Sequence, residues 1–393
     1  MAMKRLLELM AEKKASDIFV SVGAPISIKI NGLTMPINQQ IVKPDTVRAL
    51  MAEILGERQL KEFNEEWELN TSYPMPGLGS FRVSCFIQRS TPAMVVRYIP
   101  GEVPAFDTLG LPPILKEVVL EKRGLILMVG ATGSGKSTSL AAMIDHRNAL
   151  QSGHIITIED PIEFLFKHKR SIVNQRELGT DSKSYHVALK NALRQAPDVI
   201  LIGEIRDRES MSMAIAYAQS GHLCLATLHA NNSYHALNRI ISFYPLENRP
   251  ALLSDLSATL RVIVSQRLVK NTKGGRCPAV EVLLNTRHIA ELIEEGKINE
   301  IKEAIDKSLS PGSQTFEQAL FGMFRDGTIT QEEALANADS ANNLLWLMNN
   351  ADASLMQAAT AAPKPVLEQQ VERVSSGASF SEFKLNLDDE KAA

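Results

Sequence analysis

Residues 130–138 have the composition and spacing of a loop that binds phosphate groups. They fit the pattern G-x-x-x-x-G-K-[ST], in which glycines let successive backbone N–H groups point at phosphate oxygens. A helix that starts there would add its partial positive charge. We expect Lys136 to contact the β- and γ-phosphates of ATP and Ser137 to bind Mg²⁺. The candidate phosphate-binding residues are Gly130, Ala131, Thr132, Gly133, Ser134, Gly135, Lys136, Ser137 and Thr138.

The segments on either side of this loop support the same interpretation. Residues 124–129 are an apolar run that predicts a buried strand, and residues 139–144 have the composition of a helix. A strand, a loop and a helix in this order are the context that a phosphate-binding P-loop requires. The alternative is a glycine- and serine-rich turn that contains a lysine by chance, and both flanks argue against it.

Hydrolysis of a nucleotide also needs an oriented water and a stabilised γ-phosphate. Residues 198–204 form an apolar strand that ends in a carboxylate, Glu204, which is the form of a Walker B element. At the carboxyl end of a parallel strand, Glu204 would face the nucleotide and act as the general base or position the water. The alternative is a solvated loop glutamate.

Residues 155–163 predict another strand, with three carboxylates at its end. Mg²⁺ prefers oxygen ligands and often contacts carboxylates through its waters, so Glu159 and Glu163 are candidate metal-site residues. Glu163 is also a candidate catalytic residue. Asp160, which precedes Pro161, is an alternative turn-capping residue.

Histidines bracket a further predicted strand within residues 220–229. A histidine beside the γ-phosphate can report whether that group is present, and His229 is the better candidate for this role. The alternative is a structural histidine at a strand end.

The composition limits the classes of function. A length of 393 residues predicts two or three domains, and the formal net charge of −3 does not favour a nucleic-acid partner. Cys85, Cys224 and Cys277 lie far apart in sequence, so we expect reduced thiols in or near the core rather than a zinc site. The sequence contains neither a signal-peptide pattern nor an apolar run long enough to span a membrane, which predicts a cytoplasmic protein.

The pattern of apolar runs and breakers predicts five segments. We expect an N-terminal α+β domain (1–99), a proline-rich linker (100–113), an α/β core with a parallel sheet (114–284), a helical C-terminal region (285–350) and a flexible tail (351–393). A docking peptide at the end of the tail is the alternative to a disordered terminus.

Taken together, four segments resemble the boxes of the secretion ATPase superfamily, which serves type II secretion and type IV pili. They are residues 130–138 (Walker A), 157–163 (Asp box), 198–204 (Walker B) and 221–231 (His box). The resemblance covers nearly all of residues 1–348. It implies a RecA-like P-loop NTPase core, a smaller PAS-like N-terminal domain, ATP and Mg²⁺ as cofactors, and a homo-oligomeric, hexameric ring.

Within that superfamily the chain is similar to the retraction ATPases, the PilT/PilU group, because it lacks the four-cysteine motif common in extension and secretion relatives. Residues 288–292 carry no arginine after Ile289, which is more like the accessory PilU branch. The resemblance implies Mg²⁺-dependent ATP hydrolysis that powers or assists pilus retraction at the inner face of the cytoplasmic membrane. It implies two partners, an inner-membrane platform protein and a paralogous retraction ATPase.

The resemblance also implies arginines that reach the phosphates from an adjacent domain or subunit. Arg82 and Arg97 are the candidates in the N-terminal domain, and Arg239 is a further one. Ordinary surface or salt-bridged arginines are the alternative. Two other functions stay open: a pilus-extension or secretion ATPase, and a nucleotide-gated accessory subunit that assists a partner ATPase.

Overall fold

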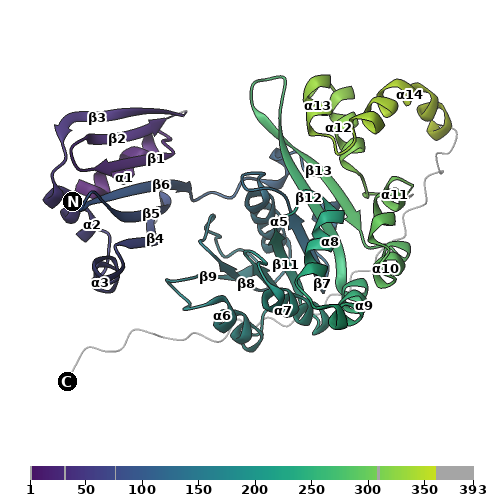
Figure 1. Ribbon diagram of the computed structural model, residues 1–393, viewed down its shortest axis with the longest axis horizontal. Helices are drawn as coiled ribbons and strands as arrows, with labels where there is room; N and C mark the ends of the chain where they lie inside the picture. Colours follow the sequence, from purple (N-terminus) through teal and green to yellow (C-terminus); the bar gives the residue numbers. More distant parts are fainter. Residues whose placement is uncertain (1, 31, 76, 308–309, 360–393) are drawn as a thin grey trace, which may run out of the picture. The chain divides into compact units, whose positions relative to one another are not determined.

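Two β-sheets organise the chain (Figure 1). The computed structural model describes residues 2–30, 32–75, 77–307 and 310–359. One sheet has six strands in the order β3-β2-β1-β6-β5-β4, and every neighbouring pair in it is antiparallel. The other has seven strands in the order β13-β12-β7-β11-β10-β8-β9, and all of its pairs are parallel except β12 with β13.

The antiparallel sheet has a core on one face. Its elements are α1 (Ala2–Glu12), β1 (Asp17–Ser21), β2 (Pro25–Ile30), β3 (Leu33–Ile41), α2 (Pro44–Ala52), α3 (Glu57–Glu66), β4 (Glu68–Met75), β5 (Gly79–Gln88) and β6 (Thr91–Pro100). Helix α1 buries Met3, Leu7 and Met10 at helical spacing. In β5, alternate residues from Phe81 to Cys85 are buried, so Arg82 lies on the opposite face of the strand.

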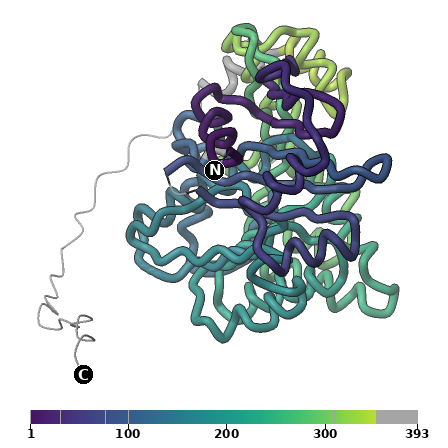
Figure 2. The backbone as a smooth tube through the Cα atoms, turned by 90° about the vertical axis from the view of Figure 1, so that its left-hand side faces the viewer, coloured from purple at the N-terminus to yellow at the C-terminus, as the bar shows by residue number. Residues whose placement is uncertain are grey.

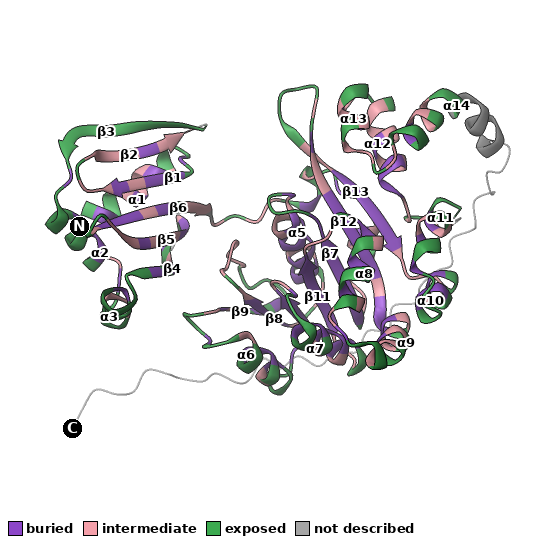
Figure 3. Ribbon diagram, in the orientation of Figure 1, coloured by how far each residue is buried: buried purple, intermediate pink, exposed green. Residues whose placement is uncertain are grey.

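The seven-stranded sheet is covered by helices on both faces, as its buried strands require. Its strands are β7 (Gly124–Val129), β8 (Gly153–Glu159), β9 (Ser171–Glu177), β10 (Val199–Ile202), β11 (Leu223–Leu228), β12 (Leu260–Lys270) and β13 (Arg276–Leu284). The helices are η1 (Phe106–Thr108), α4 (Ile114–Val118), α5 (Lys136–Leu150), α6 (Tyr185–Ala192), η2 (Leu193–Gln195), α7 (Arg208–Gln219), α8 (Ser233–Ser242), η3 (Leu246–Asn248) and α9 (Arg249–Thr259). Every residue of β7, β10 and β11 is buried (Figure 3).

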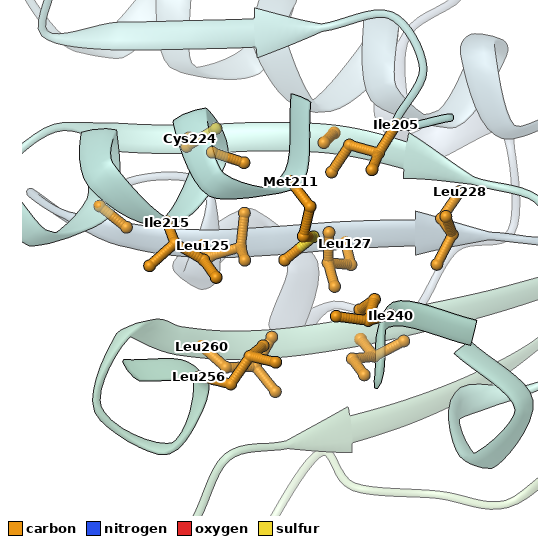
Figure 4. Packing of buried hydrophobic residues seen from close by; sticks show 14 of the residues in the cluster. Leu125, Leu127, Ile205, Met211, Ile215, Cys224, Leu228, Ile240, Leu256 and Leu260 are labelled. Atoms are coloured by element: carbon orange, nitrogen blue, oxygen red, sulfur yellow. The ribbon is translucent and has the colours of Figure 1, made fainter. Parts of the chain in front are cut away.

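Alternate residues of β7 enter two separate cores. Leu125 and Leu127 pack with residues of α7, α8 and α9, including Met211 from α7 (Figure 4). Ile126 and Met128 join the core on the other face, which α4 and α5 cover. Packing on both sides fixes the strand, and the parallel arrangement brings the carboxyl ends of β7, β8, β10 and β11 to one edge of the sheet.

The helices after the β12–β13 hairpin pack in two places, the first of them against α8 and α9 and the later ones on the hairpin. They are α10 (Arg287–Glu294), η4 (Ile298–Glu300), α11 (Ile301–Asp306), α12 (Phe316–Arg325), α13 (Gln331–Asn337) and α14 (Ala341–Ala359). Phe316 and Leu320 of α12 share a buried cluster with Val269 and Ala279 of the hairpin. The backbone trace accordingly has the yellow-green helices beside green segments of the chain (Figure 2).

The named strands and helices expected from sequence are present, but several elements were not singled out. Strands β4 and β9 were missed because at least half of the residues in each are polar, and β9 is a half-exposed edge strand. Helix α14 continues past residue 351 into the segment predicted to be a flexible tail, and residues 360–393 of that segment lie outside the described residues. None of the described helices is long and apolar enough to cross a membrane.

Candidate active site

The predicted phosphate-binding loop connects β7 to α5 at the carboxyl edge of the sheet. Gly130, Gly133 and Gly135 have φ values of +154°, +78° and +87°, which side chains disfavour. A Cβ atom on Gly130 would lie 2.6 Å from the carbonyl oxygen of Gln266, and one on Gly135 would lie 2.7 Å from its amide nitrogen. The loop therefore has no room for side chains at Gly130 and Gly135, and its backbone forms the cradle.

Lys136 is the first residue of α5 and is buried. Its ammonium group donates to the carbonyl oxygens of Gly130 at 2.8 Å and Ala131 at 2.9 Å. Burial lowers the pKa of Lys136, and the carboxylates of Glu204 and Glu163 oppose this shift. The charge therefore lies inside the loop and within the field of both acids, where a β- or γ-phosphate would meet it.

Gln266 of β12 holds the phosphate-binding loop in place by hydrogen bonds of its side chain. Its side chain is 2% exposed, donates to the carbonyl oxygen of Ser134 at 2.8 Å and accepts from the hydroxyl of Ser139 at 2.7 Å. A single buried amide thus connects the loop to the first turn of α5. No sequence motif marks this glutamine, because its role depends on the pairing of β12 with β7.

Glu159 ends β8 in a partly buried position. Its carboxylate accepts from the Thr157 hydroxyl at 2.6 Å and from the Gln175 amide at 3.2 Å. Burial raises the pKa of Glu159 to about 7, against the effect of these hydrogen bonds.

Glu204 follows β10 and is bound on both sides of its carboxylate. Arg206 Nε donates to Oε2 at 2.7 Å, and His229 Nε2 lies 3.1 Å from Oε1. Arg206 also pairs with Asp160 at 3.4 Å, which connects the ends of β8 and β10. The predicted base and the predicted γ-phosphate sensor are therefore in direct contact.

Backbone and side-chain hydrogen bonds hold the ends of β10 and β11 together. The backbone N–H of Ile205 donates to the Thr227 carbonyl oxygen at 2.8 Å, and the Thr227 hydroxyl donates to the carbonyl oxygen of Gly203. These two hydrogen bonds connect the loop that carries Glu204 to the end of the strand that precedes His229.

The strand ends and the phosphate-binding loop surround a cavity of about 210 Å³. Its polar wall includes Lys136, Ser137, Glu159, Glu163, Glu204 and His229. Its apolar wall includes Leu140, Ala141, Phe164 and Phe166. A charged end beside an apolar end suits a ligand that combines phosphates with a flat ring.

The donor set of the cavity fits Mg²⁺ held jointly with phosphates. Within the described residues, no three His, Cys, Asp or Glu side chains are placed to bind a metal together. Mg²⁺ typically uses one or two protein oxygens, several waters and substrate phosphates. The Ser137 hydroxyl and the carboxylates of Glu159 and Glu163 line the same cavity and match this need.

Comparison with known proteins assigns the chain to a family. Residues 2–336 match the family described as type II/IV secretion system protein. The chain belongs to this family. It is 50% identical over 345 residues to the type IV pilus ATPase PilU of Pseudomonas aeruginosa, an alignment that covers 88% of this chain and 90% of the relative. Identity to the type IV pilus retraction ATPase PilT of the same organism is 39% over 343 residues, 87% of this chain and all of the relative.

Solved structures support the same assignment. The crystal structure of the pilus retraction motor PilT with bound ADP matches with a TM-score of 0.81 and 39% identity, over 86% of this chain and 97% of that one. The ATPase DotB of Legionella pneumophila matches with a TM-score of 0.75 and 27% identity, over 85% of this chain and 94% of that one. The chain is therefore a nucleotide-binding secretion ATPase of the PilT/PilU group with the predicted fold class, and its identity is higher to PilU than to PilT.

The three candidate arginines lie in different surroundings. Arg82 Nη2 is 3.7 Å from Glu163, and its buried Nε has no hydrogen-bond partner among the described residues. Arg97 instead pairs with Asp17 of its own sheet at 2.9 Å. Arg239 is exposed on α8. Of these three candidates, Arg82 is therefore the one whose described ion pair is with a residue that lines the cavity.

Several residues of the ATPase site were not expected from sequence. Arg206 follows Glu204 closely, so its position next to the Walker B element was an available signal. Tyr185, Phe164 and Phe166 line the cavity from segments without a motif, and tertiary packing alone brings them there.

Proposed function

We propose that this ATPase hydrolyses ATP with Mg²⁺ in a ring that powers or assists the retraction of type IV pili. The observation that carries the proposal is the single cavity lined by Lys136, Ser137, Glu163, Glu204 and His229. The names of the relatives, which include PilU, PilT and a twitching motility protein of Neisseria gonorrhoeae, support pilus retraction.

In this proposal the backbone of residues 130–138 binds the phosphates through its N–H groups. The ammonium group of Lys136 exchanges carbonyl oxygens for β- and γ-phosphate oxygens, which places charge beside the bond that breaks. A Mg²⁺ ion held by Ser137, and through water by Glu159 and Glu163, would neutralise phosphate charge. The apolar wall near Phe164 receives the adenine ring of ATP.

Glu204 orients the attacking water and accepts its proton. His229 can hold the Glu204 carboxylate and respond to the presence of the γ-phosphate, since its ring nitrogen lies at hydrogen-bonding distance from that carboxylate. Arg82 is suited to stabilise transition-state charge next to Glu163, and Arg97 and Arg239 would do so from an adjacent domain or subunit.

The proposed assembly is a homo-hexamer in the cytoplasm, recruited to the membrane at the pilus base by an inner-membrane platform protein. The proposed domains are residues 1–99, the RecA-like core 114–284 and the helical region 285–350, with a hinge at 100–113. Rotation about that hinge would couple hydrolysis to movement. Identical domain angles in nucleotide-free, ATP-bound and ADP-bound rings would contradict this coupling.

One observation favours an accessory role beside a paralogous retraction ATPase. Helix α10 carries no arginine after Ile289, which is more like PilU than PilT, and identity is higher to PilU. The ATP turnover of the purified full-length protein distinguishes an active motor from a subunit that turns over little ATP.

Two variants test the catalytic assignment. Glu204→Gln keeps the size of the side chain and removes its basicity, so nucleotide binding should persist while hydrolysis is lost. Lys136→Ala should weaken both binding and hydrolysis. Turnover by Glu204→Gln at the wild-type rate would exclude Glu204 as the base.

Imaging of labelled pili in cells that lack the gene tests the biological role. Pili that fail to retract under load, and that only the wild-type gene rescues, would support a motor whose own hydrolysis matters. Rescue by Glu204→Gln as well would favour the accessory role, and a loss of all pili would favour an extension motor.

A further inference from the structure

Asp339, between α13 and α14, receives hydrogen bonds from two distant segments. Its Oδ2 accepts from the side-chain amide of Asn232 at 2.7 Å, three residues after His229. Its Oδ1 pairs with the guanidinium of Arg267 on β12. One carboxylate of the C-terminal region therefore binds both the segment after His229 and the strand that holds the phosphate-binding loop.

Further contacts fix the position of the Arg267 guanidinium group. Its Nη1 donates to the carbonyl oxygen of Asn337 at 2.5 Å, and its Nη2 donates to that of Asn231 at 3.1 Å. The guanidinium carbon lies 3.9 Å from the centre of the Phe316 ring, within cation–π distance. Because the guanidinium group is planar and fixed in this way, it holds Asn231 at a defined position.

The same segment is bound from its other side by β13. Glu281 is 3% exposed and accepts from the backbone N–H of Ser233 at 2.7 Å and from the hydroxyl of Ser265 at 2.8 Å. Asn232 in turn caps α8 by accepting from the backbone N–H of His235 at 2.9 Å. The segment 231–233 is thus held between the hairpin, α8 and Asp339.

The position of Asp339 is itself tied to α12. The backbone N–H of the next residue, Ser340, donates to Glu317 at 2.8 Å, and Glu317 also binds Lys302 at 3.1 Å. None of the described residues after 284 lines the cavity. The described C-terminal helices therefore do not line the candidate site, and Asp339 and Arg267 connect them to the segment after His229.

We propose that Asp339 and Arg267 are positioning residues for His229. By holding Asn231 and Asn232, they keep the His229 ring against the Glu204 carboxylate, so the C-terminal helices set the rate of hydrolysis without touching the nucleotide. This inference rests on the proposed function, in which Glu204 and His229 act in hydrolysis.

The test measures steady-state ATP turnover of the full-length protein. Asp339→Ala removes the acceptor for both Asn232 and Arg267, so kcat should fall about tenfold while KM for ATP stays within about twofold. Asp339→Asn keeps one acceptor oxygen, which can serve Asn232 or Arg267 but not both, and should recover part of kcat. Asp326→Ala removes an exposed carboxylate of α12's C-terminal end and serves as the matched control, with kcat unchanged.

A double variant separates positioning from a general loss of stability. If Asp339 acts through His229, adding Asp339→Ala to His229→Ala should lower kcat by less than about twofold. A full tenfold loss in that background, or an unchanged kcat for Asp339→Ala alone, would overturn the inference while leaving the proposed function intact. An unchanged kcat for His229→Ala alone would refute the role of His229 in the proposed function, and the inference with it.

Hydrogen exchange of the variant Arg267→Lys gives a second measurement. Arg267→Lys keeps the charge but loses the fork that binds Asn231 and Asn337. It should increase exchange of the backbone amides of residues 229–233 and leave those of the phosphate-binding loop unchanged. Equal exchange in these amides for wild type and Arg267→Lys would contradict the inference.

Discussion

The free energy of unfolding of the variant Glu159→Gln, compared with that of the wild type, should increase as the pH rises. Burial raises the pKa of Glu159 from 4.5 to about 7, so the folded protein binds this proton more tightly than the unfolded chain does. The free energy of unfolding of the wild type therefore decreases as the pH rises from about 4.5 through 7. Gln has a similar shape and can still accept from the Thr157 hydroxyl, but it does not titrate.

The expected size follows from this shift. A pKa raised from 4.5 to about 7 corresponds to roughly 3 kcal/mol once Glu159 is ionised in both states, at about 1.36 kcal/mol per pKa unit. Between pH 5 and pH 8, linkage gives a change of roughly 2–3 kcal/mol. The free energy of unfolding of Glu159→Gln relative to wild type should rise by this amount, because all other groups titrate alike in the two proteins.

Urea unfolding of both proteins without nucleotide, followed by far-UV circular dichroism at pH 5, 6, 7 and 8, measures the difference. Glu62→Gln on the exposed side of α3 controls for the loss of one negative charge. A difference between Glu159→Gln and wild type that stays constant across this range, within about 0.5 kcal/mol, would refute the argument that Glu159 is desolvated.

Two other substitutions test contacts around the site, and a third tests the far end of α5. Gln266→Leu leaves the Ser134 carbonyl without its donor, so the KM for ATP should rise about tenfold in steady-state assays; an unchanged KM would contradict this role. Gly203→Ala would bring a Cβ within 2.9 Å of the Tyr185 hydroxyl. It should cost about 1–3 kcal/mol in urea unfolding, which Tyr185→Phe should partly restore if the clash is the cause. Arg147→Met leaves two carbonyl oxygens without their buried donor, so the free energy of unfolding should fall by more than about 1 kcal/mol. A smaller loss in the same urea assay would argue against that role.

The parts of the site that the sequence predicts are those set by local structure. The loop 130–138 is recognisable because its glycines, its lysine and its flanking strand and helix are contiguous. Glu204 is recognisable for the same reason, as a carboxylate at the end of an apolar strand. In both cases the side chain's place follows from one strand end, and parallel pairing brings the strand ends together.

The remaining contacts depend on elements that are distant in sequence. Gln266 reaches the phosphate-binding loop because β12 pairs with β7, and Asp339 reaches Asn232 because α12–α14 pack on the hairpin. Strand pairing also gives Arg97, a candidate phosphate contact, a different partner: β1 pairs with β6 and places Asp17 beside it. Residue type and spacing along the chain carry no information on such pairs.

The burial of the cysteines has a practical consequence for labelling. Cys85 and Cys224 are buried, and burial raises the pKa of Cys85 to about 12 and that of Cys224 further. Cys277 is half-buried, and its pKa is raised for the same reason. Because the thiolate is the form that reacts with maleimides, we expect these native thiols to react more slowly at neutral pH than an exposed cysteine with an ordinary pKa. A cysteine introduced on an exposed helix would therefore take a fluorophore selectively, and optical distance measurements can proceed without removing the native cysteines.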